Sequence, residues 1–293
     1  MEKSEKLQKV LARMGVASRR EAEVMIVSGR IAVNGVPAKL GDRVGPEDKI
    51  TLDTRPLQAV ENESERVRII IYNKPEGEVC TRSDPEGRPT VFDKLPKLKQ
   101  GRWVIVGRLD LNTTGLLIFT TDGELANRLM HPSSNIDREY VVRVRGEIDD
   151  DMIRRLKEGV LLDDGMARFS DIRESRSGGS HRWFNVVLME GRNREVRRLW
   201  ESQGCMVSRL KRARYGYIFL PSRLRLGQWE YMGQKDAAVL YEMAGLPAPE
   251  VHEPRSLQRR VEAAQSKGGR RAAQGKLPHG RPQRGRSGPA KAR

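Results

Sequence analysis

The chain of 293 residues has only two cysteines, four histidines and an aromatic content of 5%. Cys80 and Cys205 lie far apart and form no CxxC pair, which argues against a disulfide framework and against a cysteine-rich zinc site. Such cysteine usage fits a reducing compartment, so we expect the protein to be cytoplasmic. The four histidines do not form a set of metal ligands, and no metal site is expected.

The signatures of common cofactor and hydrolase sites are also missing. The sequence contains no GxxxxGK[ST], no GxGxxG after a strand, no HExxH and no GxSxG. No apolar run reaches the length of a membrane-spanning helix, and the N-terminal MEKSEKLQKV lacks the apolar core of a signal peptide. We therefore expect no cofactor and no membrane partner, which leaves a cofactor-free reaction or binding alone.

Positive charge is what the sequence has in excess. It contains 55 Lys and Arg against 39 Asp and Glu, a net charge of +16. A polyanion is the expected partner of such a protein, and nucleic acid is the commonest one. Residues 251–293 carry twelve Lys or Arg, two Glu and no aromatic residue. This composition predicts a disordered basic tail, which serves either as a solubilising appendage or as a nonspecific grip on nucleic acid.

The first sixty residues predict two helices followed by short strands. Apolar residues recur at helical spacing over 7–14, and SRRE at 18–21 is a capping box for a second helix. The pair Asn34-Gly35 between apolar residues predicts a hairpin, and a further strand is expected at 50–52. Residues 54–66 have little apolar content and are interpreted as a linker.

The stretch KLQKVLARMGVASRREAEVMIVSGRIAVNGVPAKLGDRV resembles an S4 RNA-binding domain. The resemblance implies RNA contact by basic residues on or next to the two helices. Without it, such charges would be an ordinary solvated helix face. Two of them stand at a helix N-terminus, where backbone N–H groups add to the attraction for phosphate. The predicted RNA-binding residues are Lys6, Lys9, Arg13, Arg19 and Arg20.

The central region mixes strands and helices without a regular βαβ repeat. One helix is expected to begin at a capping box at 121–124 and to end before His131-Pro132, and another is expected over 192–203. The irregular order favours an α+β fold over a doubly wound one. The expected strands lie at 67–72, 103–106, 116–119, 138–144, 183–188 and 206–210.

An acidic residue stands in an unusual place in GRLDLNTTGLLIFTTDGEL, residues 107–125. One interpretation of Asp110 is a turn in which its short side chain bonds amides downstream. A functional interpretation requires a carboxylate that stays ionised near a cation. Arg108 is close in sequence, but we expect the counter-ion of Asp110 to come from elsewhere in the chain. The local sequence leaves both interpretations open.

GRLDLNTTGLLIFTTDGELANRLMHP resembles the catalytic motif of pseudouridine synthases, in the RsuA/RluB branch that joins an S4 domain to the enzyme. Within the branch, the similarity is greatest to the type that acts on large-subunit ribosomal RNA. The resemblance runs from about residue 4 to residue 232. Other matching segments are YNKPEGEVCTRSDPEGRPTVFDKLP, REYVVRVRG and EGRNREVRRLWESQGCMVSRLKRARYG.

The resemblance assigns roles to four residues. It implies that Asp110 is the catalytic carboxylate, that Arg197 is its cationic partner, and that Tyr140 stacks on the flipped base. It further implies that Arg108 holds the backbone of the flipped nucleotide. Without the resemblance, Tyr140 would be a packed aromatic and Arg197 part of a solvated helix face. The family reaction uses the carboxylate as a nucleophile at C1′ or C6, or as a base on a sugar proton, and the sequence does not distinguish these routes.

These observations predict an S4 domain at 1–62, a catalytic domain at 66–245 with a mixed, mainly antiparallel sheet and flanking helices, and the basic tail. The predicted function is isomerisation of a uridine in 23S ribosomal RNA to pseudouridine. The expected partner is that RNA in a large-subunit assembly intermediate, and the expected oligomeric state is a monomer. Two alternatives are a synthase of the small-subunit (16S) type and a catalytically silent RNA-binding or ribosome-assembly protein.

Overall fold

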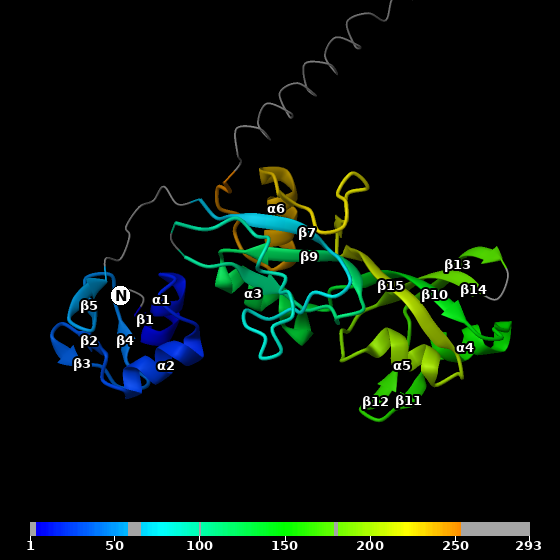
Figure 1. The fold of residues 1–293 in the computed structure, drawn as a ribbon, viewed down its shortest axis with the longest axis horizontal. Helices are drawn as coiled ribbons and strands as arrows, with labels where there is room; N and C mark the ends of the chain where they lie inside the picture. The colour runs from blue at the N-terminus through cyan, green and yellow to red at the C-terminus, as the bar shows by residue number, and fades with distance from the viewer. Residues whose placement is uncertain (1–3, 58–65, 100, 179–180, 253–293) are drawn as a thin grey trace, which may run out of the picture. The chain divides into compact units, whose positions relative to one another are not determined.

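The computed structural model describes residues 4–57, 66–99, 101–178 and 181–252 (Figure 1). The segments 4–57 and 66–252 are considered separately below. Apart from Val251 and His252, the predicted basic tail lies outside the described residues, so its disorder stays a prediction. Val251 is buried and forms a β-bridge with Val67.

The N-terminal segment contains the two predicted helices and the predicted hairpin. Ser18 Oγ accepts from the Glu21 amide at 3.1 Å, and the Ser18 amide donates to the Glu21 carboxylate at 2.6 Å, which confirms the capping box. Asn34 and Gly35 have φ of 53° and 82°, as a two-residue hairpin of this hand requires. Its elements are β1 (Glu5–Lys6), α1 (Leu7–Arg13), α2 (Arg19–Val27), β2 (Ile31–Val33), β3 (Val36–Pro37), β4 (Arg43–Val44), β5 (Ile50–Leu52) and β6 (Arg55–Leu57).

The linker predicted at 54–66 was wrong at its start. Residues Arg55–Leu57 form β6, which pairs with β5 at the edge of a four-stranded sheet ordered β3-β2-β5-β6. Asp53 and Thr54 have φ of 47° and 67°, and this tight turn folds the chain back on β5. An edge strand needs few apolar residues, because one side of it faces solvent.

The elements of the larger segment begin at residue 69. They are β7 (Ile69–Lys74), β8 (Val104–Val106), β9 (Thr114–Thr120), α3 (Gly123–Met130), a 3₁₀ turn (Pro132–Ser134), β10 (Arg138–Arg145), α4 (Asp150–Glu158), β11 (Val160–Leu162), β12 (Gly165–Ala167), β13 (Asp171–Gly178), β14 (His181–Leu188), α5 (Glu195–Glu201), β15 (Met206–Tyr215), β16 (Ile218–Phe219), β17 (Trp229–Tyr231) and α6 (Gln234–Met243).

A single nine-stranded sheet organises this segment (Figure 1). Its main path is β13-β14-β10-β15-β9-β7-β17, with β16 paired to β15 and β8 to β9. Strands β9 and β15 run parallel, and every other pair in the sheet is antiparallel. This confirms the predicted α+β fold with a mixed, mainly antiparallel sheet.

Helices cover the sheet on both faces, but over different strands. Alternate residues of β7 and β9 point to opposite faces, so Tyr72 belongs to one buried cluster and Ile71 to the other. The first cluster includes residues of α4 and α5, and the second includes residues of α3 and α6. In the ranges described, no helix is both long and apolar enough to cross a bilayer.

Helix α3 begins one residue later than the capping box predicted at 121–124. Asp122, not Thr121, is the cap: its carboxylate accepts from the amides of Glu124 at 2.8 Å and Leu125 at 3.2 Å. The hydroxyl of Thr121 is already engaged, because it accepts from the Arg68 amide at 3.0 Å.

Candidate active site

Asp110 lies in the loop that connects β8 to β9 and is half-buried. The turn closes through the main chain, because the Thr113 amide donates to the Asp110 carbonyl at 3.0 Å. The interpretation in which the Asp110 side chain bonds its own downstream amides is therefore wrong. Among the residues described, no group donates a hydrogen bond to the carboxylate, so the side chain is available for chemistry.

A buried lysine donates hydrogen bonds to the main chain of this loop. The side chain of Lys74 at the end of β7 is fully buried, and its ammonium donates to the carbonyls of Asp110 at 3.1 Å, Leu111 at 3.3 Å and Thr113 at 3.0 Å. It also bonds the Pro75 carbonyl at 2.9 Å. An ammonium has three N–H donors, so four carbonyls share them. Burial lowers the pKa of Lys74, and the negative charge of Asp110 is among the charges that oppose this shift.

Two further side chains complete the hold on the loop. Cys80 Sγ bonds the Leu109 carbonyl at 3.2 Å, and an Arg197 guanidinium nitrogen bonds the Asn112 carbonyl at 2.9 Å. With the Lys74 bonds, every carbonyl from 109 to 113 has a side-chain donor from outside the loop. These bonds hold the main chain of the loop and so position Asp110, while its carboxylate forms no hydrogen bond with the described residues.

The direct ion pair predicted between Asp110 and Arg197 is absent from the ion pairs of the described residues. Arg197 is 8% exposed, and its other terminal nitrogen donates to the Val207 carbonyl at 2.9 Å. Both terminal nitrogens of the Arg197 guanidinium therefore donate to main-chain carbonyls. Burial lowers the pKa of Arg197 and the charge of Asp110 opposes that shift, so the two residues interact electrostatically without a hydrogen bond. Arg197 stabilises the loop that carries the carboxylate.

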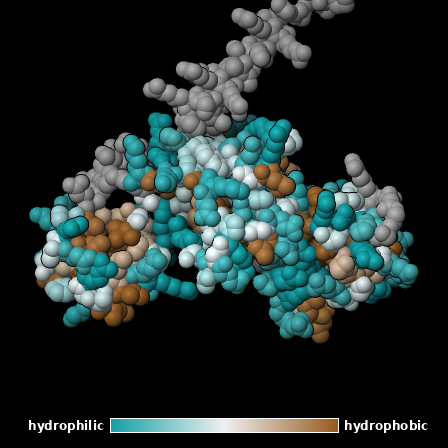
Figure 2. Space-filling view, viewed as in Figure 1, coloured by the Kyte–Doolittle hydropathy of each residue, from teal (hydrophilic) through white to brown (hydrophobic). Residues whose placement is uncertain are grey.

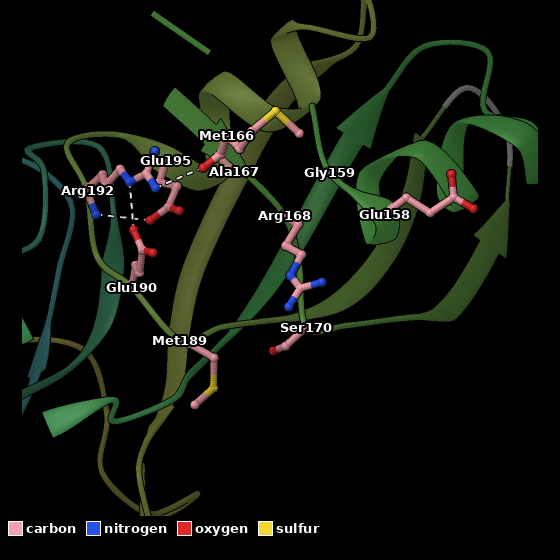
Figure 3. A pocket seen from close by; sticks show the side chains of 10 residues that line it. All are labelled: Glu158, Gly159, Met166, Ala167, Arg168, Ser170, Met189, Glu190, Arg192 and Glu195. Atoms are coloured by element: carbon pink, nitrogen blue, oxygen red, sulfur yellow. Dashed lines mark hydrogen bonds and ion pairs between the residues drawn. The ribbon is translucent and has the colours of Figure 1, made fainter. Parts of the chain in front are cut away.

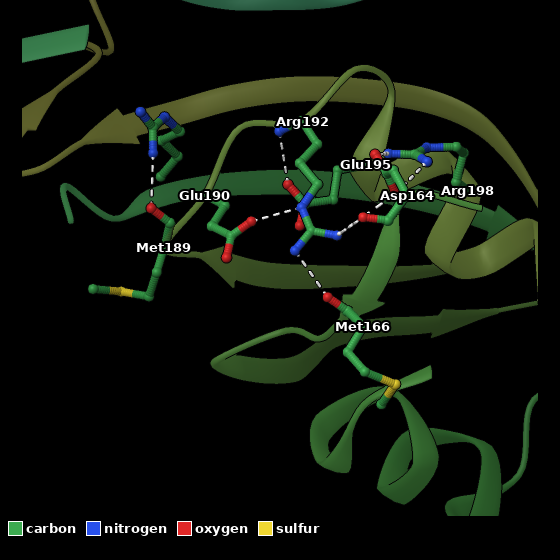
Figure 4. A network of polar contacts seen from close by, with 8 residues as sticks. Asp164, Met166, Met189, Glu190, Arg192, Glu195 and Arg198 are labelled. Atoms are coloured by element: carbon green, nitrogen blue, oxygen red, sulfur yellow. Dashed lines mark hydrogen bonds and ion pairs between the residues drawn. The ribbon is translucent and has the colours of Figure 1, made fainter. Parts of the chain in front are cut away.

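Polar contacts fix the start of α5, the helix that carries Arg197 (Figure 4). Arg198 turns the other way and donates twice to the Asp164 carboxylate, at 2.8 Å each. Arg192 donates to the Glu190 carboxylate at 2.6 Å and to the Met166 carbonyl at 2.8 Å. The two consecutive arginines thus diverge, and Arg197 is the one that reaches the Asp110 loop.

A pocket of about 360 Å³ lies beside this network (Figure 3). The end of α4, the β11–β12 hairpin and the segment before α5 supply its lining, and Asp110, Tyr140 and Arg197 do not line it. The hairpin exposes Leu161 and Met166, and hydrophobic side chains show at its tip in Figure 2. The pocket therefore lies among the residues that hold the start of α5 and is not part of the Asp110 site.

Glu195 should make the stability of this domain depend on pH. Its side chain is buried and accepts from the Arg192 amide at 3.0 Å, and burial raises the pKa of its carboxyl above the ordinary value of 4.5. The stabilisation from a raised pKa is complete below the unfolded pKa and is lost as the pH rises through the folded one. Glu195→Gln keeps the acceptor and removes the titration.

We therefore expect the melting temperature of Glu195→Gln, relative to that of the unsubstituted protein, to rise as the pH increases above about 4.5. Thermal denaturation followed by circular dichroism at several pH values measures this difference. Parallel curves for the two proteins would show that Glu195 does not titrate differently in the folded state.

Tyr140 and Arg108 differ in their exposure to solvent. Tyr140 is 8% exposed on β10, and it shares a buried cluster with Leu109, the neighbour of Asp110. Arg108 is exposed. The structure thus brings Asp110, Arg197 and Tyr140 to one region and leaves Arg108 at the surface, which suits a residue meant for a phosphate. Their roles stay predictions.

The basic residues predicted on the N-terminal helices differ in whether they form ion pairs with carboxylates of the described residues. Lys9 and Arg13 both pair with Glu5. The other three are exposed and form no ion pair within the described residues: Lys6, Arg19 and Arg20. The pair at the start of α2 therefore has charge available for an anion.

Three further residues of the region were not predicted from the sequence: Lys74, Cys80 and Arg212. Lys74 follows the apolar residues 69–72 after one asparagine, and a lysine at the end of a buried strand must find acceptors. Arg212 is 3% exposed, and its Nε donates to the Leu116 carbonyl at 2.8 Å. Gly115 has φ of 105°, and a Cβ there would lie 2.2 Å from the Arg212 carbonyl oxygen. This glycine permits the parallel contact of β9 with β15.

Comparison with known proteins identifies the family. Residues 68–202 match the family described as RNA pseudouridylate synthase, and residues 5–50 match the S4 domain. The chain is 57% identical over 246 residues to the ribosomal large subunit pseudouridine synthase B of Escherichia coli K12, covering 83% of this chain and 84% of that protein. The chain belongs to the pseudouridine synthase family. The predicted resemblance to S4-containing pseudouridine synthases is therefore confirmed.

Two further relatives of this pseudouridine synthase define the extent of the match. Identity to the protein of the same name from Pseudomonas aeruginosa is 61% over 243 residues, which covers 83% of this chain but 63% of that protein. A solved structure described as a crystal structure of pseudouridylate synthase matches with a TM-score of 0.56 and 25% identity, covering 81% of this chain and 99% of that one. It supports the assignment of the fold.

Proposed function

We propose that this pseudouridine synthase isomerises one uridine of large-subunit (23S) ribosomal RNA, with Asp110 as the reacting carboxylate. In this reaction the bond from N1 to C1′ breaks and a bond from C5 to C1′ forms. The proton on C5 is lost and N1 gains one. The relatives named ribosomal large subunit pseudouridine synthase B support the substrate class.

One observation carries the proposal. The loop of residues 109–113 is held through its carbonyls, whereas the carboxylate of Asp110 accepts no hydrogen bond among the residues described. A group that reacts must be held in place while its reactive atoms stay free, and the five bonded carbonyls of 109–113 achieve this. The positive charges of Lys74 and Arg197 both interact electrostatically with Asp110. No step in this scheme requires a group that the chain itself does not supply.

The remaining site residues handle the RNA in this proposal. A uridine inside folded RNA must leave its stack to be reached, and Tyr140 offers an aromatic face to the flipped base. Arg108 is exposed next to the loop and contacts the backbone of that nucleotide. Lys6, Arg19 and Arg20 of the S4 region contact phosphates elsewhere on the RNA and set affinity.

Purified protein and two transcripts test this proposal. Protein-free large-subunit and small-subunit ribosomal RNA, each labelled with tritium at C5 of uridine, are incubated with the protein, and released tritium is counted. We expect release of about one tritium per large-subunit RNA and none from small-subunit RNA. Release from the small-subunit RNA alone would reassign the substrate, and release from neither would favour a silent RNA-binding protein.

A further inference from the structure

Among the described residues, no helix covers the face of β10, β14 and β15 that lies opposite α4 and α5. On β10, the residues Tyr140, Val142 and Val144 point into the cluster that contains α4 and α5. The alternate residues of β10 and β14 point the other way, and Val141 and Trp183 belong to none of the buried clusters. Figure 1 shows α4 and α5 on one side of β10, β14 and β15, and α3 and α6 lie over β7 and β9.

Cations line this uncovered surface, which we call the open face. Arg143 is paired across the sheet with Trp183 on one side and Arg209 on the other, so the three side chains form one row. Lys211 and Arg145 follow two residues along the same strands and share the face. Arg145, Arg209 and Lys211 are exposed and Arg143 is half-buried.

These four cations have no carboxylate partner among the residues described. Arg143 donates to the Ser208 hydroxyl at 2.8 Å and lies 5.9 Å from the centre of the Trp183 ring. In contrast, Arg182 and Arg214 on the neighbouring positions of the same strands each pair with glutamate, Arg214 at 2.9 Å. Glu139 alternates with Tyr140 and so shares the face of Arg143, but its partner is Arg214. The strands therefore form ion pairs at other positions and supply no carboxylate to these four cations.

The like charges of the open face lower the stability of the sheet, and binding of a polyanion would offset this loss. Arg143 and Arg209 stand directly opposite each other on adjacent strands, and like charges in that position destabilise a sheet. An apolar or alternating-charge surface would fold more readily. A polyanion that lies across the strands would neutralise the row.

We propose that the open face binds the phosphate backbone of a second segment of the substrate RNA, on the side of the sheet opposite to Tyr140. This inference rests on the proposed ribosomal RNA substrate. The segment that delivers the uridine meets the Tyr140 side, whereas the open face contacts RNA further along the molecule. Phosphate contacts of this kind position an RNA without reading its sequence.

Two triple variants that remove the same charge test the proposal. The open-face triple is Arg143→Gln, Arg209→Gln and Lys211→Gln. The control triple is Arg154→Gln, Arg225→Gln and Lys235→Gln, which alters exposed cations of α4, a loop and α6. Each is assayed on the complete large-subunit transcript and on a short hairpin transcript that carries the modified uridine, with binding measured over a range of salt.

On the complete transcript, we expect the open-face triple to raise KM about tenfold or more and to lower the slope of log affinity against log salt by about two. On the hairpin, both triples should match the unsubstituted protein in kcat and KM. Because the Arg143–Arg209 repulsion is removed, the melting temperature of the open-face triple should not fall.

Equal salt slopes and equal KM for the two triples on the complete transcript would overturn the proposal. So would an open-face effect that appears only when ribosomal proteins are present, because the partner would then be an acidic protein surface. If the unsubstituted protein isomerises neither transcript, the proposed function fails, and the salt slopes alone decide whether the open face binds RNA.

Discussion

Replacing Asp110 by Asn should lower kcat for uridine isomerisation by about 10⁴-fold or more. The amide has the shape of the carboxylate but cannot act as a nucleophile or as a base. Because the carboxylate accepts no hydrogen bond among the residues described, the free energy of unfolding should change by less than about 0.5 kcal/mol. RNA affinity should also stay within a few-fold. Tritium release under single-turnover conditions and urea denaturation measure these effects.

Asp163→Asn is a suitable control for this substitution. Asp163 is an exposed carboxylate in the β11–β12 turn, and it supports no element of the site. The control should keep full activity. An Asp110→Asn protein that retains a tenth or more of the rate would contradict the assignment of the reacting group.

Replacing Lys74 by Met should destabilise the domain by about 2 kcal/mol or more and reduce kcat by about 100-fold. The substitution keeps an apolar chain of similar length in the strand but removes the donor for the carbonyls of Pro75, Asp110, Leu111 and Thr113. Buried carbonyls without donors are costly, and the loop would then move. Measurement of kcat well below the melting temperature separates loss of position from loss of folding.

Lys99→Met controls for the loss of one lysine, because Lys99 is exposed and is not one of the side chains that bond the carbonyls of the loop. It should leave both stability and kcat unchanged. The view that Lys74 positions Asp110 would fail if Lys74→Met lowered the melting temperature but left kcat intact at a temperature where the variant is fully folded.

The regular elements were predictable because they depend on local patterns. The capping box at Ser18 and the hairpin at Asn34 follow from side chains within three residues of each other, and both are present. The cap of α3 was misplaced by one residue, since the hydroxyl of Thr121 bonds Arg68, a residue distant in sequence. β6 was missed because an edge strand has little apolar signal.

The sequence pointed to residues of the candidate site but not to the contacts that they make. Motif resemblance pointed to Asp110 and Arg197, and the structure brings both to one region. The sequence could not show that Arg197 bonds the carbonyls of Asn112 and Val207 instead of the carboxylate, because main-chain acceptors leave no trace in composition. The same reason hid Lys74, whose partners are all carbonyls.

Mapping of pseudouridines in both ribosomal RNAs of a strain that lacks this protein tests the account most directly. We predict that one pseudouridine disappears from the large-subunit RNA and that the small-subunit map is unchanged. A plasmid encoding the unsubstituted chain should restore that site, and one encoding Asp110→Asn should not. An unchanged map, or restoration by Asp110→Asn, would contradict the claim that this chain isomerises a large-subunit uridine through Asp110.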